Sequence, residues 1–131
     1  MEETRTNHKA IHSFRDLEVY QMATTGAGMI YHFSINFPKE EKYSLTDQVR
    51  RSSRAVAAMI AEAWARRRYE AAFINKLNKA QGEATETQAW LDQALDCQYL
   101  RPEQHRELDL HFQQIGGKLN RMIEKSSTFC P

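Results

Sequence analysis

The chain has 131 residues and a mass of 15.3 kDa, and its 18 Lys and Arg residues nearly balance its 17 Asp and Glu residues. This length suits one domain with a single core, and the net charge of +1 argues against nucleic-acid binding through a generic polybasic surface. The two cysteines, Cys97 and Cys130, lie far apart and do not form a disulfide framework. Reduced thiols suit a cytoplasmic protein, which is the location we expect.

Residues 1–13 form the predicted disordered arm, because they are mainly polar, show no hydrophobic periodicity and contain no apolar signal segment. Ser13 and Asp16 have the spacing of a capping box, and the first predicted helix then runs to about Asn36, ahead of Phe37-Pro38. Its stripe, at spacings of three and four residues, consists of Leu17, Tyr20, Thr24, Ala27, Tyr31 and Ser34.

Three more helices are predicted over about 44–67, 69–99 and 102–125, with Ser44 as the cap of the second and a loose tail over 126–131. Their stripes are Leu45, Val49, Ser52, Val56, Met59 and Ala63; then Phe73, Leu77, Ala80, Ala84, Thr87, Leu91 and Leu95; then Leu108, Phe112, Ile115, Leu119 and Met122. No run alternates as a strand does. The expected fold is therefore all-α, an up-down-up-down antiparallel four-helix bundle over residues 14–125.

The stretch from Val19 to Pro38 contains no Asp, Glu, Lys or Arg, yet its polar residues are too frequent for a membrane span, so no membrane is expected as a partner. Such a helix either exposes little surface to water or is buried on two faces, one of them against another subunit. The second helix has small residues and a tryptophan beside its core stripe. A homo-oligomer is therefore expected, with an interface that includes Gly28, His32, Ala57, Ala61 and Trp64.

The near-neutral total conceals a separation of charge along the chain. Residues 39–68 carry eight bases and four acids, a net charge of +4, whereas residues 69–110 carry four bases and eight acids, a net charge of −4. Arginine pairs with phosphates and with carboxylates, so three interpretations stay open. The arginines contact nucleic acid or an acidic protein, they pair with acids of the same bundle or of a neighbouring subunit, or they form a solvated face. The candidate nucleic-acid-binding residues are Arg50, Arg51, Arg54, Arg66, Arg67 and Arg68.

The residues that could carry chemistry do not form a recognised catalytic or metal motif. The pairs His105/Asp109 and Glu107/His111 are four residues apart on one helix, but a di-iron bundle needs Glu-x-x-His motifs, so they indicate a solvated polar face. No metal, cofactor or enzymatic activity is predicted. Glu62 stands among apolar residues and is expected in a partly buried ion pair with an arginine. The glycines, Gly26, Gly28, Gly82, Gly116 and Gly117, are expected where helix backbones approach closely.

Four segments, 14–21, 37–51, 60–62 and 77–86, read FRDLEVYQ, FPKEEKYSLTDQVRR, IAE and LNKAQGEATE. In this order they resemble a bacterial four-helix-bundle family encoded within intervening sequences of 23S ribosomal RNA genes. That family includes the accessory variability determinant of diversity-generating retroelements. The resemblance implies a barrel-like homopentamer and, in the retroelement branch, binding to a reverse transcriptase and to nucleic acid.

This sequence departs from the family pattern at several positions. Met59 and Ala63 stand where the family often has Asn and Gly, and Glu83 stands where it often has Ser, so no role of those side chains is carried over. The expected function is a non-catalytic, homo-oligomeric accessory protein that binds structured RNA or DNA through the second helix, with a reverse transcriptase as a partner where one is encoded beside it. The alternative is a protein-interaction scaffold whose arginines form intersubunit salt bridges.

Overall fold

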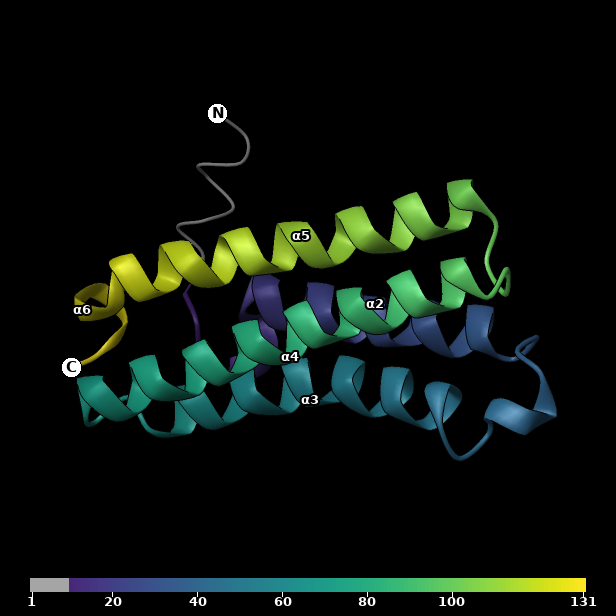
Figure 1. Cartoon of the computed structure of the whole chain (residues 1–131). Helices are drawn as coiled ribbons and strands as arrows, with labels where there is room; N and C mark the ends of the chain where they lie inside the picture. The colour runs from purple at the N-terminus through teal and green to yellow at the C-terminus, as the bar shows by residue number, and fades with distance from the viewer. Residues whose placement is uncertain (1–9) are drawn as a thin grey trace.

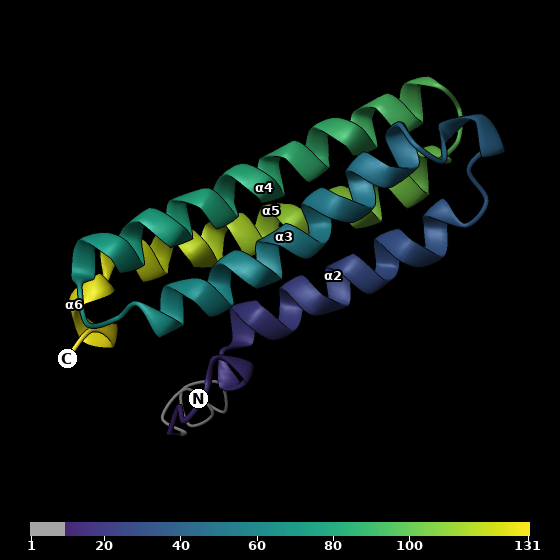
Figure 2. The same ribbon diagram turned by 90° about the horizontal axis from the view of Figure 1, so that it is seen from below.

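Four long helices pack side by side in the computed structural model, which describes residues 10–131 (Figures 1 and 2). In chain order the elements are η1 (Phe14–Asp16), α2 (Glu18–Ser34), η2 (Lys39–Glu41), α3 (Leu45–Ala65), α4 (Glu70–Asp96), α5 (Pro102–Glu124) and α6 (Ser126–Phe129). Short connections make successive long helices antiparallel. The predicted all-α four-helix bundle is confirmed, and the described part of the chain contains no strand.

The ends of the helices depend on local hydrogen bonds that were only partly predicted. The capping box at Ser13 and Asp16 is present, although it caps the short η1 rather than α2. At α3 the predicted role of Ser44 is wrong, because its hydroxyl donates to the Glu41 carboxylate at 2.7 Å. That carboxylate also accepts the backbone N–H of Leu45, so Glu41 supplies the capping group.

The predicted core stripes of α4 and α5 are confirmed except at Leu95, which is half-buried while Ala94 is buried. In α3 the stripe is correct except that Ile60 is buried and Met59 is half-buried. In α2 the predicted stripe is wrong by one residue. Apart from Leu17 and Ser34, its members are not buried, and the side chains that enter the core are Val19, Ala23 and Ile30, with Gly26 between them. The error arose because α2 has uncharged residues on every face, so polarity did not mark its outer side.

Several interhelical contacts join the pair α2 and α3 to the pair α4 and α5, and two of them lie in the core. Between α2 and α5, a Cβ placed on Gly26 would lie only 2.8 Å from Cζ of Phe112, so the absence of a side chain permits this approach. Between α3 and α4, the buried hydroxyls of Ser52 and Thr87 are hydrogen-bonded at 2.8 Å. At the other four glycines, by contrast, an added Cβ would meet no atom within 4 Å, so a close approach is not the reason for glycine at Gly28, Gly82, Gly116 and Gly117.

The predicted loose tail is also wrong, because residues 126–129 form α6 at the end of the bundle (Figure 1). Phe129 stacks on the buried Phe73 with ring centroids 6.0 Å apart, and the Ser126 hydroxyl donates to Glu70. The tail is ordered because an aromatic side chain covers the end of the core. Residues 1–9, most of the predicted disordered arm, lie outside the described residues. None of the helices within residues 10–131 has the length and apolar character needed to cross a bilayer.

Candidate nucleic-acid interface

The outer surface shared by α2 and α3 brings together most of the predicted functional residues. The two helices lie side by side in Figure 2, and residues spaced by three and four along each helix share one face. We call this surface the α2–α3 face, formed by Ala27, Gly28, Tyr31 and His32 of α2 and by Arg50, Arg54, Ala57, Ala61 and Trp64 of α3.

Arg50 is held across the α2–α3 face by two contacts. Its Nε donates to Oγ of Ser34 at 2.7 Å, and its guanidinium carbon lies 4.7 Å from the ring centroid of Tyr31. Contrary to the predicted core stripe, Tyr31 is therefore on the outside, where 44% of its surface is exposed. A cation stacked on an aromatic ring, with its position already set, is well suited to meeting a phosphate or a base.

Arg54 lies one turn further along α3 and borders a shallow hollow of about 320 Å³. The other residues lining this hollow are Ala27, Gly28, Tyr31 and His32. Because Gly28 has no side chain, the floor of the hollow is open beside the two helices. The hollow thus combines a guanidinium, an imidazole and a phenol ring, which are side chains that bind phosphates and stack on bases.

No acidic side chain within the described residues neutralises these arginines. The ion pairs there are Lys76–Glu62, Arg101–Glu103, His105–Asp92 and Lys118–Glu18, and none involves an arginine of α3 or of the turn after it. Arg50 and Arg54 therefore do not pair with the acidic helix of the same bundle, whereas the charge of Arg51 acts on Glu83 of that helix. The charges of Arg50 and Arg54 have no acidic partner within the described residues.

The other four candidate arginines do not lie with Arg50 and Arg54. Arg51 donates to Gln48 at 3.2 Å and lies on the α4 side of α3. There its charge opposes the increase in the pKa of Glu83 that burial and the neighbouring Glu86 cause. The cluster at residues 66–68 follows the C-terminal end of α3, about 24 Å along the helix from Arg50. The structure therefore divides the six arginines among three places.

Trp64 is less exposed than the sequence suggested. The guanidinium carbon of Arg67 lies 3.6 Å from the indole, and Nε of Arg67 donates to the carbonyl of Trp64 at 2.9 Å. Trp64 packs against the core as a half-buried side chain. Ala57 and Ala61 are half-buried, and Gly28 and His32 are exposed. Spacings of three and four residues place Ala57, Ala61 and Trp64 on one side of α3, and Gly28 and His32 on one side of α2. Their role in an oligomer stays a prediction.

The ion pair predicted for Glu62 is present, but its partner is a lysine instead of an arginine, and Glu62 is the more exposed of the two side chains. Glu62 bonds to Lys76 of α4 at 2.9 Å, and 46% of its side chain is exposed. The hydrogen bond and the positive charge of Lys76 hold the pKa of Glu62 below its usual value. Apolar neighbours in the sequence did not bury this carboxylate, because position 62 lies on the outer side of α3, next to α4.

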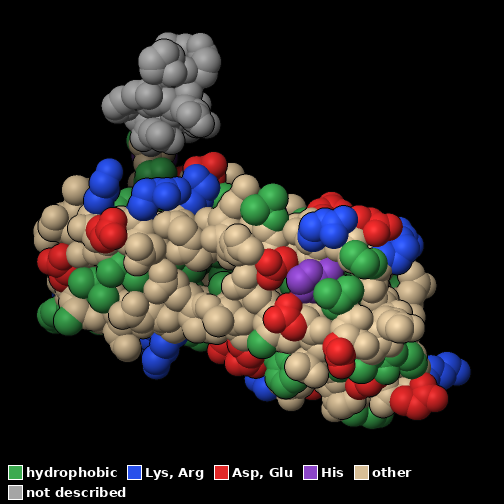
Figure 3. Space-filling view, turned by 45° about the horizontal axis from the view of Figure 1, so that its top comes forward, with side chains coloured by type: hydrophobic (Ala, Val, Ile, Leu, Met, Phe, Trp, Pro, Cys, Tyr) green, Lys and Arg blue, Asp and Glu red, His purple; other side chains and the backbone are tan. Residues whose placement is uncertain are grey.

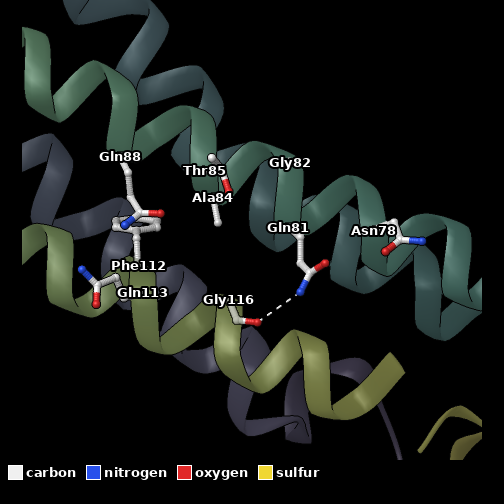
Figure 4. Close-up of a pocket in the computed structure, with 9 residues that line it drawn as sticks. All are labelled: Asn78, Gln81, Gly82, Ala84, Thr85, Gln88, Phe112, Gln113 and Gly116. Carbon is white, nitrogen blue, oxygen red and sulfur yellow. Dashed lines mark hydrogen bonds between the residues drawn. The ribbon is translucent and has the colours of Figure 1, made fainter. Parts of the chain in front are cut away.

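A second, larger hollow was not predicted and lies between α4 and α5 (Figure 4). It measures about 690 Å³, and its lining is dominated by carboxamides rather than charges. Gln81 crosses from α4 and donates to the carbonyl of Gly116 on α5 at 3.2 Å. The seven-residue spacing of Gln81 and Gln88 was the available signal, since residues two turns apart share a face.

The polar face predicted for α5 is not simply solvated. His105 is hydrogen-bonded to Asp92 of α4 at 2.8 Å, and only 15% of its side chain is exposed. His111 bonds through Nε2 to the carbonyl of Met22 at 2.7 Å, while its predicted companion Glu107 is exposed. Figure 3, which shows the side of the molecule where α5 lies, places histidine among acidic side chains. Both histidines therefore tie α5 to a neighbouring helix.

Comparison with known proteins places the chain in a family. The model for the 23S rRNA-intervening sequence protein family matches residues 15–121. A crystal structure from Bacteroides thetaiotaomicron, described as a protein of unknown function from the S23 ribosomal protein family, is similar with a TM-score of 0.74 and 28% identity. The match covers 81% of this chain and 95% of that chain. No curated protein sequence matches this chain significantly.

Proposed function

This chain belongs to the family of 23S rRNA-intervening sequence proteins, and we propose that it is a non-catalytic, homo-oligomeric accessory protein that binds RNA or DNA through the α2–α3 face. The observation that carries the proposal is the position of Arg50 and Arg54. They flank an aromatic hollow and have no acidic partner within the described residues. Phosphate contacts from arginine supply much of the affinity of nucleic-acid-binding proteins.

The two halves of the α2–α3 face would have different tasks. The half with Arg50 and Arg54 would contact phosphates, while the half with Ala57, Ala61 and Trp64 would contact another subunit. Small side chains allow a neighbouring helix to approach, and the exposed Ile35 and Tyr31 add apolar surface that a monomer has no need to expose. A homopentamer, as the family resemblance implies, would repeat the arginine pair around a ring and raise the affinity by multivalency.

The family match concerns intervening-sequence proteins, so the proposal extends to nucleic acid and not to a reverse transcriptase. The unpaired thiols Cys97 and Cys130 are consistent with the cytoplasm, where such a protein would meet RNA. Structured ribosomal RNA is the first probe to use.

The test is fluorescence anisotropy with a labelled, structured fragment of 23S ribosomal RNA, over a salt series that starts at 50 mM. For the wild type, we expect the logarithm of the binding constant to fall linearly with the logarithm of the salt concentration. The double variant Arg50→Ala/Arg54→Ala should reduce the magnitude of this slope by about two, because each bound chain loses about one phosphate contact per arginine. The matched control is Arg106→Ala/Arg121→Ala, which removes the same charge from exposed positions on α5. Equal losses in both double variants would refute the α2–α3 face as the binding site.

Light scattering on the same variants separates the proposal from the scaffold alternative. We expect Arg50→Ala/Arg54→Ala to keep the oligomeric mass and lose RNA binding, and Ala61→Glu to lower the mass, because it places a charge on the proposed contact. Ala71→Glu, an exposed position on α4, is the control. Dissociation of the double arginine variant, with no RNA binding by the wild type at 50 mM salt, would favour intersubunit salt bridges instead.

A further inference from the structure

Three side chains that could bind a metal ion meet where α4 ends and α5 begins. Asp92 comes from α4, and His105 and Asp109 come from successive turns of α5. One donor atom from each lies within 4.8 Å of the other two. From this geometry we propose that Asp92, His105 and Asp109 bind a divalent transition-metal ion of the Zn²⁺ type, which is independent of the proposed nucleic-acid role.

The distances are close to those of a coordination site. In a tetrahedral zinc site with bonds of about 2.0–2.1 Å, neighbouring donor atoms are about 3.3 Å apart. Oδ1 of Asp92 and Nε2 of His105 are now 2.8 Å apart and share a hydrogen bond. An ion would replace the shared proton, widen this gap slightly and draw the Asp109 carboxylate inward.

The surroundings of Asp109 resemble the outer shell of a metal site. Oδ1 of Asp109 accepts from Gln88 at 3.0 Å, and Oδ2 accepts from Gln113 at 2.7 Å. Figure 4 shows these two carboxamides on opposite helices beside Phe112, where they line the α4–α5 hollow. Hydrogen bonds of this kind fix the direction of a ligating carboxylate and commonly change metal affinity by about 10–100-fold. A simple ion pair between Asp92 and His105 would not need the hydrogen bonds that Gln88 and Gln113 donate to Asp109.

Charge and ligand type favour a particular class of ion. Two carboxylates and a neutral imidazole balance a divalent cation, and residues 69–110 carry a net charge of −4. The imidazole favours zinc and related transition ions over Mg²⁺ and Ca²⁺, which prefer sites made of oxygen. Three protein ligands leave a tetrahedral ion one position for water or for a group of a partner. Asp92, of which 67% is exposed, would lie on the solvent side of the ion.

The experiment is a Zn²⁺ titration of the full, tag-free and metal-free chain in competition with a chromophoric chelator. The variants Asp92→Asn, His105→Gln and Asp109→Asn retain hydrogen-bonding capacity, and each is expected to weaken Zn²⁺ binding by about 100-fold or more. Gln113→Ala is expected to weaken it by about 10-fold. The controls Asp96→Asn, Glu107→Gln and His12→Gln remove exposed ligand-type groups elsewhere and should change the affinity less than twofold.

The fold of each variant is checked by its circular dichroism and melting temperature without metal, so that a folding defect is not mistaken for loss of a ligand. Wild type should melt at a higher temperature with Zn²⁺, and the three ligand variants should not. Equal affinity in wild type and the three ligand variants would overturn the proposal. Displacement of Zn²⁺ by equimolar Mg²⁺ would do so too, because it would indicate an acidic surface without a transition-metal site.

Discussion

The two helix pairs of this bundle present opposite surfaces. On the α2–α3 face, arginines stand beside a helix whose only charged residue is Glu18 at its N-terminal end. Arg50 contacts a ring and a hydroxyl and not an acid. On the α4–α5 side, acids bond to a histidine and to a carboxamide across the two helices, and to a second carboxamide within α5. Arg50 and Arg54 of the first surface have no acidic partner within the described residues, whereas the polar side chains of the second surface are hydrogen-bonded to one another and include the three proposed metal ligands.

This difference changes the meaning of the net charge of +1. The total is a sum over two surfaces of opposite sign, so it excludes a uniformly basic protein but says nothing against one local basic site. If the two pairs are as independent as their surfaces suggest, changes on one surface should leave the other unaffected. Changes at the contacts that join the pairs should affect the whole fold.

The largest effect is expected at the contact between α2 and α5. Phe112→Ala removes a fully buried ring and should lower the free energy of unfolding by about 3–5 kcal/mol, as measured by urea denaturation. Gly26→Leu should also destabilise the fold, because its side chain would collide with Phe112. The double variant should lose less than the sum of the two, since the leucine can occupy part of the space left by the ring. Simple additivity would show that Gly26 and Phe112 do not share this contact.

The contact between α3 and α4 should respond less. Ser52→Ala removes the hydroxyl that bonds to Thr87, and the free energy of unfolding should fall by about 1 kcal/mol. The loss is small because Thr87 still donates to the carbonyl of Glu83. Adding Thr87→Val should cost little more, since both partners are then apolar. A loss of several kcal/mol from Ser52→Ala alone would mean that the hydroxyl has a further structural role.

The outer surface of α2 should respond in the opposite direction. Gly28→Ala adds a methyl group that meets no atom within 4 Å and removes a residue unfavourable in a helix, so an isolated chain should gain about 1 kcal/mol of stability. In the proposed oligomer the same methyl group would lie on the α2–α3 face. Light scattering beside denaturation therefore separates the two effects: higher stability with a lower oligomeric mass would place Gly28 in the interface.

Most of the fold could be predicted from the sequence because α3, α4 and α5 each have charged residues that mark the outer side. α2 has only Glu18, at its first residue, and its core face was assigned one residue away from Val19, Ala23 and Ile30. The arginines of the candidate site were visible in the sequence, but the ring under Arg50 was not, because Tyr31 was assigned to the core.

Contacts between distant residues were beyond the reach of helical periodicity. Asp92 and His105 are 13 residues apart and belong to different helices, so spacing within one helix could pair His105 only with Asp109. For the same reason, spacing could not show that Arg50 contacts the Tyr31 ring and the Ser34 hydroxyl and not an acid. Spacing shows which residues share a face, but the packing of the helices decides which faces meet.

The smallest effect is expected where the two connecting segments meet at one end of the bundle. Tyr99, in the α4–α5 connection, donates to the Glu41 carboxylate of η2 at 2.9 Å. Hydrogen bonds from Ser44 and Tyr99 hold the pKa of Glu41 below its usual value, and the same carboxylate raises the pKa of Tyr99 to about 12. A carboxyl group whose pKa is lowered on folding stabilises the fold fully at a pH above its pKa in the unfolded chain, and this stabilisation is lost as the pH falls through its pKa in the folded chain. A phenol group whose pKa is raised on folding stabilises the fold fully at a pH below its pKa in the unfolded chain, and this stabilisation is lost as the pH rises through its pKa in the folded chain.

Tyr99→Phe should therefore lower the melting temperature slightly and almost equally between about pH 5 and pH 9, and the difference from wild type should shrink below about pH 4 and above about pH 10. Tyr69→Phe, at an exposed position, is the control and should show no such profile. Within the described residues, the hydrogen bond between Tyr99 and Glu41 is the one polar contact between the α2–α3 connection and the α4–α5 connection. A constant difference at every pH would mean that Tyr99 acts only through its ring, which lies 5.5 Å from that of Phe37.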